Sequence, residues 1–239
     1  MARAMTPVDR STPAAEALAR ISGWDKARPF VVAQLGQSLD GRIATASGES
    51  FYINGAEGLD HLHRLRAAVD AVVVGAGTIS ADNPQLTVRR VGGRSPARVV
   101  VDPRGRLGAT GKWLADDGAA KIVVSAAARS PLPGVETVVL PSREGRIAPA
   151  DIVAALAERG FRRILVEGGA ATISSFVDAD AIDRLHIIFG CAIIGSGRPG
   201  LELAPIERLA EARRPATEVY RLGRCDFLFD CALRDEAGR

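Results

Sequence analysis

Apolar residues occur along the chain in short runs, and turn residues separate most of these runs. The runs that are rich in Val and Ile predict buried strands at residues 30–35, 71–75, 98–102, 121–125, 135–140, 163–166 and 183–189. Two further runs, 218–223 and 225–233, flank a tight turn at Gly223 and Arg224, which is typical of an antiparallel pair.

Helical patterns lie between several of these strands. Residues 55–69 have apolar positions near one face, and Asn54 with Glu57 three residues later predicts a capping box at the start of that helix. Residues 147–159 form a second amphipathic segment, which Gly160 would terminate. The alternation predicts one α/β domain over residues 29–233, with a mostly parallel sheet and an antiparallel edge.

The two ends of the chain are expected to lie outside this domain. Residues 1–28 read as a flexible or short helical extension, in which Thr12 could be an N-cap and Pro13 could occupy the first turn. Residues 234–239 are polar and are expected to form a frayed tail.

Composition excludes several classes of function. The chain has 239 residues, of which 47% are hydrophobic and 25% charged, as in a globular domain with a sizeable core. All but three of the 31 basic residues are arginines, which suits bidentate contacts to phosphate or carboxylate. The net charge of +3 is scattered and aromatic residues make up only 5%, so we expect no nucleic-acid binding.

Cysteine and histidine usage argues against a metal site. The three cysteines have no metal-like spacing and are expected to be reduced, mostly packed thiols of a cytoplasmic protein. His61 and His63 are two apart on a predicted helix and cannot easily share a metal. No apolar run reaches ~18 residues, so no membrane span is expected.

The most informative stretch follows the strand at 163–166. Glu167 stands at the carboxyl end of that strand, and Gly168 and Gly169 precede a helix start. Ligands of open α/β sheets bind at this edge, and a glycine pair before a helix lets backbone N–H groups approach a phosphate. Glu167 would then be a lone carboxylate beside an anion site. A plain strand-to-helix turn explains the same residues.

Four other features of the chain could complete such a site. Gly75–Thr78 is a second glycine-bearing turn at the end of a strand, and residues 37–50 form a long polar loop after another strand. Arg66 falls on or beside an apolar helix face, where a ligand anion or a position at the surface could satisfy its charge. Arg104 and Arg106 follow a strand and could hold a 2′-phosphate or lie in a solvated turn.

Several motifs together resemble one family. They are residues 38–44, 65–67, 70–75, Thr78, residues 81–89, 100–102 and 166–169. In this order and spacing they are similar to the reductase domain of riboflavin biosynthesis, the RibD C-terminal family. The resemblance covers residues 29–233 and implies a three-layer α/β/α fold like that of dihydrofolate reductase.

The resemblance also implies an activity and a set of site residues. Such reductases use NADPH to reduce the ribosylamino side chain of a phosphorylated pyrimidine to the ribityl form. The substrate would contact Ser50, Arg66, Leu86, Arg89 and Glu167. The cofactor would contact Tyr52, Gly75, Thr78, Asp82, Pro103, Arg104, Gly168, Gly169, Ala170, Ala171 and Thr172.

The chemistry expected by resemblance is transfer of a hydride from NADPH to C1′ of the ring-opened ribose. Glu167 and Asp40 are the candidate catalytic carboxylates for the accompanying proton, with water as an alternative. No metal is expected. The signature of the zinc deaminase found in bifunctional members is absent. A stand-alone reductase, as in archaeal and fungal relatives, is therefore expected. Those relatives act before deamination, and the sequence leaves open whether this chain acts before or after that step.

Three positions depart from the family pattern. Gln34 replaces a usual lysine, Tyr52 a usual tryptophan, and Pro103 a small polar residue that offers an N–H. These departures leave two alternatives open: a reductase of the same fold for another heterocycle, dihydrofolate included, or a nucleotide-binding protein without turnover. A homodimer is expected by resemblance, with weak support from the long apolar segment at residues 187–194.

Overall fold

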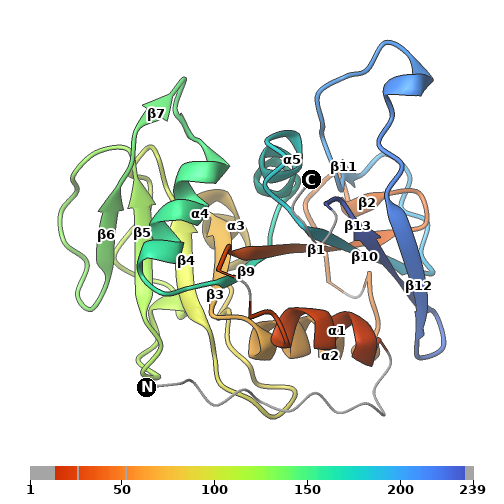
Figure 1. Ribbon diagram of the computed structural model, residues 1–239, viewed down its shortest axis with the longest axis horizontal. Helices are drawn as coiled ribbons and strands as arrows, with labels where there is room; N and C mark the ends of the chain where they lie inside the picture. The colour runs from red at the N-terminus through yellow and green to blue at the C-terminus, as the bar shows by residue number, and fades with distance from the viewer. Residues whose placement is uncertain (1–13, 26, 52, 235–239) are drawn as a thin grey trace.

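A nine-stranded sheet forms the centre of the computed structural model, which describes residues 14–25, 27–51 and 53–234 (Figure 1). Its strand order is β12-β13-β10-β1-β9-β3-β4-β5-β6. The strands are Phe30–Ser38 (β1), Ala71–Gly75 (β3), Ala97–Val101 (β4), Lys121–Ser125 (β5), Glu136–Val139 (β6), Arg163–Val166 (β9), Arg184–Gly190 (β10), Ala216–Leu222 (β12) and Asp226–Ala232 (β13).

The sheet is parallel from β10 to β6 and antiparallel only at β13 and β12. This arrangement confirms the predicted fold class. Two small antiparallel pairs lie outside the sheet, Arg42–Ala44 (β2) with Arg198–Pro199 (β11), and Ser142–Arg143 (β7) with Arg146–Ile147 (β8).

Helices cover both faces of the sheet and make three layers. They are Ala15–Ser22 (α1), Ala56–Ala68 (α2), Ala76–Asp82 (α3), Pro149–Glu158 (α4) and Ala170–Asp178 (α5), with 3-10 turns at Lys112–Leu114 (η1) and Leu209–Glu211 (η2). Residues of α4 and α5 pack on one face, and residues of α1, α2 and α3 pack on the other.

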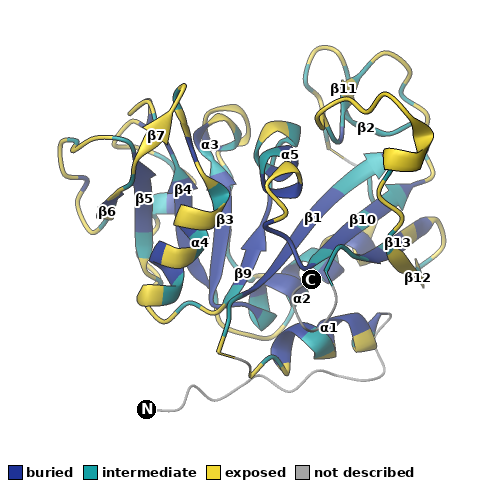
Figure 2. Cartoon of the chain, turned by 45° about the horizontal axis from the view of Figure 1, so that its top comes forward, coloured by how far each residue is buried: buried dark blue, intermediate teal, exposed yellow. Residues whose placement is uncertain are grey.

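The side chains of β1 point alternately into two hydrophobic cores, one on each face of the sheet. Val31 and Ala33 belong to the core under α4 and α5, whereas Phe30 and Val32 belong to the core under α1 and α2. Successive side chains of a strand point to opposite faces, so a strand that is covered on both sides must be apolar throughout. Figure 2 shows the central strands as an almost continuous buried layer.

One predicted helix start is wrong, and a second falls on residues that are not described. Asn54 does not cap α2, because its side-chain Nδ2 donates to the carbonyl of Ile188 at 3.2 Å and Gly55 occupies the N-cap position. The Asp226 carboxylate accepts from the Gly55 N–H at 2.7 Å instead, so a tertiary contact takes the place of the local cap. Ala14 is the N-cap of α1, while Thr12 and Pro13 lie outside the described residues.

Other local differences arise where short strands interrupt predicted segments. β1 continues to Ser38 and β2 lies within the predicted 37–50 loop. Ile147 was expected in a helix but belongs to β8, and α4 starts at Pro149. Gly160 does terminate this helix region: its φ is +82°, and its N–H donates to Ala157 O at 2.9 Å.

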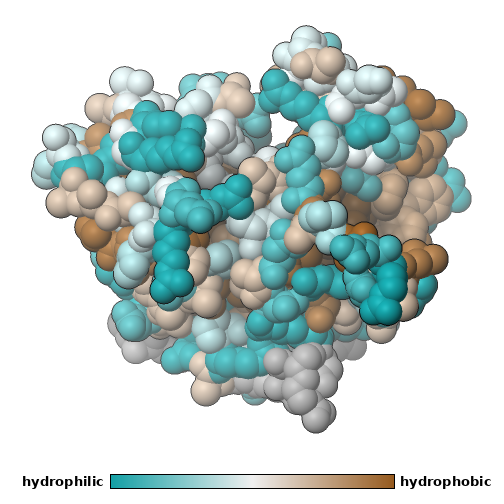
Figure 3. Space-filling view, turned by 90° about the horizontal axis from the view of Figure 1, so that it is seen from above, coloured by the Kyte–Doolittle hydropathy of each residue, from teal (hydrophilic) through white to brown (hydrophobic). Residues whose placement is uncertain are grey.

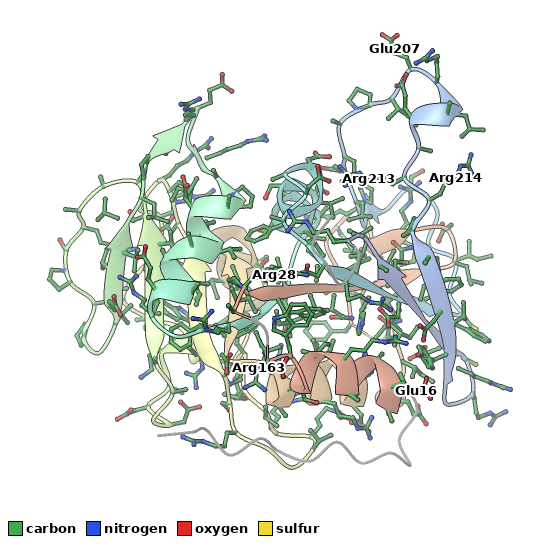
Figure 4. All side chains as sticks on the ribbon, viewed as in Figure 1. Glu16, Arg28, Arg163, Glu207, Arg213 and Arg214 are labelled. Carbon is green, nitrogen blue, oxygen red and sulfur yellow. The ribbon has the colours of Figure 1, made fainter. Side chains whose placement is uncertain are left out.

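Buried ion pairs fix the amino ends of the central strands. Asp70, which precedes β3, accepts from the Arg163 guanidinium at 2.8 Å and from the Arg162 N–H at 3.0 Å. Asp183, which precedes β10, accepts from Arg28 at 2.6 Å and from the Val31 N–H at 2.8 Å. Figure 4 labels Arg28 and Arg163 at this edge. These carboxylates join neighbouring strands at the edge opposite the glycine turns.

Among the described helices, none is long and apolar enough to cross a membrane.

The first described helix is well packed, since Leu18 and Ile21 of α1 are buried. Its Arg20 pairs with Asp230 of β13 at 3.1 Å and with Glu218 of β12 at 2.5 Å.

A buried polar cluster joins α2 to the antiparallel edge. His61 Nε2 lies 3.2 Å from His186 Nδ1, and His186 Nε2 lies 3.1 Å from the Asp230 carboxylate. All three side chains are buried. Desolvation, followed by His186 and Arg64, holds the pKa of His61 well below its usual value of 6.5.

The His61 shift predicts a loss of stability in mild acid. His61 stays neutral when folded but takes up a proton in the unfolded chain below about pH 6.5. The free energy of unfolding should therefore fall from pH 7 towards pH 5, with His61 adding up to about 1.4 kcal/mol per pH unit. In urea unfolding, His61→Gln should show a shallower pH dependence than the wild type.

Leu62→Ala provides the matched control for this measurement. Leu62 is half-buried on the same helix, so its truncation should lower stability equally at both pH values. Equal pH slopes for His61→Gln and Leu62→Ala would contradict the assignment.

Candidate active site

The two glycine turns predicted from the sequence lock together at the carboxyl edge of the sheet. Gly168, with φ of +109°, leaves no room for a Cβ, which would lie 2.6 Å from the Thr78 hydroxyl. A Cβ on Gly75 would lie 2.5 Å from the Thr172 hydroxyl. Each turn therefore receives a threonine from the helix of the other. The Thr78 hydroxyl also accepts from the Gly169 N–H at 3.1 Å.

The start of α5 is exposed beside these turns. Gly169 is the N-cap of α5 and provides no side-chain cap, while Ala170 is half-buried and Ala171 is exposed. The first N–H groups of a helix have no partner within it, so an anion can bind there. No charged residue occupies the first turn, and the role of residues 168–172 in binding the cofactor stays a prediction.

Glu167 is not a lone carboxylate. Arg66 of α2 donates to it in bidentate fashion, with Nε to Oε1 at 2.8 Å and Nη2 to Oε2 at 2.7 Å. The two side chains are buried, with 6% and 5% of their residue surfaces exposed. Burial alone would lower the pKa of Arg66, but the charge and hydrogen bonds of Glu167 raise it. The partner of Arg66 in the structure is thus a protein carboxylate and not a ligand anion.

Arg66 also fixes the loop that follows α3. Its Nη1 donates to the carbonyl of Thr87 at 3.1 Å. The preceding Leu86 is buried and has φ of +58°, a left-handed conformation that is uncommon for leucine. The ion pair, the loop and the end of β9 therefore form one connected unit.

Arg89 follows in this loop with its guanidinium exposed. The Arg89 N–H donates to His63 Nδ1 at 3.1 Å, which anchors the backbone. Desolvation, then Arg66 and Arg90, lower the pKa of Arg89, whereas the neighbouring Arg90 pairs with Asp60 at 2.6 Å. Crowding by like charges makes Arg89 a favourable place for an added anion.

His63 is a site residue that the sequence prediction missed. It was considered only as a metal ligand, but it is buried and accepts a backbone hydrogen bond. Desolvation, then the charges of Arg66, Arg89 and Arg90, lower its pKa to about 4, so it is a neutral acceptor at pH 7. The arginines at positions 66, 89 and 90 were the sequence signal for this lowered pKa.

Asp40 has a structural setting that argues against a catalytic role. It accepts from the Ser38 hydroxyl at 2.6 Å and from the N–H groups of Ile194 and Gly195 at 3.1 and 2.6 Å. The Ser38 bond first, and then these backbone bonds, lower the pKa of Asp40 to about 2. Asp40 therefore ties two loops together and holds no proton to donate near pH 7.

The expected 2′-phosphate region follows β4. Asp102 is fully buried and accepts from the Arg106 and Leu107 N–H groups at 2.9 Å each, so it shapes the turn that contains Pro103 and Arg104. Arg129 pairs with Asp102 at 3.2 Å, a role that the sequence did not reveal. Pro103 is half-buried, and Arg104 and Arg106 are exposed.

The remaining predicted residues are spread around this edge. Asp82 is exposed at the last position of α3, one helical turn beyond Thr78. Ser50 is half-buried between β2 and α2, and Tyr52 lies outside the described residues. The structure therefore joins Arg66 and Glu167 directly and connects them to Leu86 through the carbonyl of the next residue, Thr87. It also brings together Gly75, Thr78, Gly168, Gly169 and Thr172.

Two projections flank α5 at this edge. The β7–β8 hairpin rises on one side and the segment through η2 on the other (Figures 1 and 2). The second projection is tied to α5, because Ser174 Oγ accepts from the Glu202 N–H at 2.8 Å and Arg213 pairs with Asp180 at 2.5 Å. Seen from above, hydrophilic side chains spread over this face (Figure 3).

Curated relatives share much of the chain. A 2,5-diamino-6-ribosylamino-4(3H)-pyrimidinone 5′-phosphate reductase from Archaeoglobus fulgidus is 36% identical over 183 residues, covering 70% of this chain and 83% of the relative. The protein of the same name from Methanothermobacter thermautotrophicus is 34% identical, covering 82% and 94%. The riboflavin biosynthesis protein RibD of Bacillus amyloliquefaciens is 33% identical, and the match spans 47% of its length.

Solved structures with a similar fold have names that match those of these relatives. A diaminohydroxyphosphoribosylaminopyrimidine deaminase/5-amino-6-(5-phosphoribosylamino)uracil reductase from Thermotoga maritima superposes with a TM-score of 0.75 at 31% identity, covering 86% of this chain and 56% of that one. RibD of Acinetobacter baumannii gives a TM-score of 0.76 at 28% identity, covering 91% and 62%.

The family model named RibD C-terminal domain matches residues 29–220, which include the Arg66–Glu167 pair and both glycine turns. Most of the chain is thus accounted for by one family, and the protein belongs to the RibD C-terminal domain family.

Proposed function

We propose that this protein is an NADPH-dependent reductase of riboflavin biosynthesis, which reduces the ribosylamino side chain of a phosphorylated pyrimidine to the ribitylamino form. The observation that carries the proposal is the junction at the end of β9, where the buried Arg66–Glu167 pair adjoins Gly168 and the open start of α5. This junction lies at the carboxyl edge of a parallel sheet, and such folds bind their ligands at that edge.

The residues present fit a dinucleotide phosphate. The uncapped start of α5 offers backbone N–H groups. The glycine–threonine contacts hold the two turns together beside these groups. Arg104 and Arg106 are exposed at the end of β4 and could contact a 2′-phosphate. When bound, the reduced nicotinamide would supply the hydride.

The substrate side would be formed by the other half of the junction. Arg89 presents an exposed charge for the phosphate, on a backbone anchored by His63. A Glu167 that donated a proton would have to break its pairing with Arg66. We therefore assign Glu167 to accepting hydrogen bonds from the substrate's amine or hydroxyl groups, and we assign water as the proton source. Ser50 and Leu86 complete the proposed substrate contacts.

One observation favours a second candidate, a reductase for another heterocycle. Ala33 of β1 is in register with Val166 of β9, so the next residues along, Gln34 and Glu167, lie at the same level of the sheet. Gln34 is buried there, in place of the lysine that the resemblance implies. The substrate side thus lacks one cation beside Glu167, which would change the preferred substrate.

A homodimer and a cytoplasmic location are further parts of the proposal. Ile193, in the apolar segment that suggested a dimer, is 79% exposed. A monomeric mass in light scattering at micromolar concentration would count against the dimer.

The reductase activity can be tested directly by NADPH oxidation. The 2,5-diamino-pyrimidinone and the deaminated uracil forms of the ribosylamino phosphate are offered separately, and we expect turnover of the first. Binding of NADPH without oxidation with either compound would contradict the proposal and shift attention to Gln34.

Arg89 should control recognition of the substrate phosphate. Arg89→Ala should lower kcat/KM for the phosphorylated substrate by about 10- to 100-fold, the value of a charge-assisted hydrogen bond, and change turnover of the dephosphorylated compound little. Arg90→Ala is the matched control, because Arg90 is already paired with Asp60. Equal losses for both substrates would refute the role of Arg89.

Arg104 and Arg106 should set the preference for NADPH. The double variant Arg104→Ala/Arg106→Ala should raise KM for NADPH by about 10-fold or more and leave KM for NADH unchanged. Arg221→Ala/Arg224→Ala removes the same charge at the far end of the sheet and serves as the control. A parallel loss for NADPH and NADH would rule out this assignment.

A further inference from the structure

Two exposed cysteines lie side by side at the antiparallel edge, away from the glycine turns. Cys191 directly follows β10, and Cys225 stands in the turn between β12 and β13, directly before β13. Both thiols are free and exposed, contrary to the expectation of mostly packed cysteines. Cys231 alone follows that expectation, since it is buried on β13.

The register of β10 and β13, extended two residues beyond their last pair, would place these two cysteines opposite each other. β10 and β13 are antiparallel, with Ile188 paired to Leu228 and Phe189 to Phe227. Continuing the same register by two residues sets Cys191 against Cys225. Opposed residues of antiparallel strands have Cα atoms about 4.5–5.5 Å apart, which lies within the roughly 4.4–6.8 Å that a disulfide spans.

The Cys191 side chain already points at its neighbour. Its Sγ donates to the carbonyl oxygen of Cys225 at 2.7 Å. Desolvation, then the adjoining Cys225, raise the pKa of the Cys191 thiol. The third cysteine is directed elsewhere, because Cys231 pairs in register with Leu185 and Thr217.

The residues next to both cysteines hold the segment that begins α2. Gly190, beside Cys191, packs so closely on this segment that a Cβ would lie 1.8 Å from the Ile53 carbonyl oxygen. Asp226, beside Cys225, accepts from the Gly55 N–H at 2.7 Å. A covalent bond between the cysteines would therefore fix both supports of the start of α2, the helix that carries Arg66.

We propose that Cys191 and Cys225 are a modification site at which a low-molecular-weight disulfide such as oxidised glutathione forms an intrachain disulfide that locks the start of α2 between β10 and β13. This inference concerns the thiol pair and does not depend on the reductase activity.

The exchange proceeds in two balanced steps. The thiolate of one cysteine attacks a sulfur of glutathione disulfide, which forms a mixed disulfide and releases one glutathione thiolate. The thiolate of the second cysteine attacks the protein sulfur of this mixed disulfide and releases the second glutathione. The protein loses two protons and two electrons, and one glutathione disulfide is reduced to two glutathione thiols.

The test is incubation of the full-length protein with oxidised glutathione, followed by intact mass and peptide mapping. The wild type should lose the mass of two hydrogen atoms and yield a peptide pair linked through Cys191 and Cys225, and dithiothreitol should reverse both changes. Cys191→Ser and Cys225→Ser should each retain one glutathione, because no second thiol resolves the mixed disulfide. Cys231→Ser, the matched control, should behave as the wild type.

Hydrogen exchange measures the locking of α2. In the oxidised protein the amides of residues 53–58 should exchange more slowly than in the reduced protein, and the melting temperature should rise by roughly 5 °C. Wild-type protein that keeps glutathione on both cysteines, or that links two chains, would overturn the disulfide. Identical exchange at residues 53–58 in the two forms would overturn the locking.

Discussion

The buried bond between Arg66 and Glu167 connects the parts on which the candidate site depends. One guanidinium reaches the end of β9 through Glu167 and the loop after α3 through the Thr87 carbonyl. Removing one partner of such a pair leaves an uncompensated buried charge, which typically costs about 3–5 kcal/mol. The pair therefore constrains α2, β9 and residues 86–89 to a single arrangement, and exposed groups such as Arg89 are positioned by it.

The two edges of the sheet use charge in different ways. At the amino ends of the strands, Asp70 and Asp183 accept hydrogen bonds from backbone N–H groups of neighbouring strands and pair with arginines. Their charges are therefore neutralised by partners within the protein. At the carboxyl ends, the helix start at Gly169 has no side-chain cap, and Arg89, Arg104 and Arg106 are exposed. Backbone donors without a side-chain partner and exposed cations at the carboxyl edge are what an anionic ligand requires.

The lack of a side chain at two glycines allows the turns after β3 and β9 to pack closely against each other. Gly75 and Gly168 allow Thr172 and Thr78 to approach the opposite backbone within distances that any Cβ would block. The two turns are thereby held together by threonine hydroxyls, which the sequence indicated only as possible ligand contacts.

The sequence by itself determined the strands of the main sheet, the order of the motifs and the carboxyl-edge location of Glu167 and the glycines, because continuous Val and Ile runs and glycine turns are local signals. Only the tertiary structure decided which charges meet. Arg66 and Glu167 are far apart in the chain, Asp226 replaces Asn54 at the start of α2, and Asp40 is occupied by the 194–195 backbone. In each case the partner comes from a distant part of the chain, which a local pattern does not reveal. For the buried pair Arg66–Glu167 the pairing is also required, because an unpaired polar group inside the protein is costly.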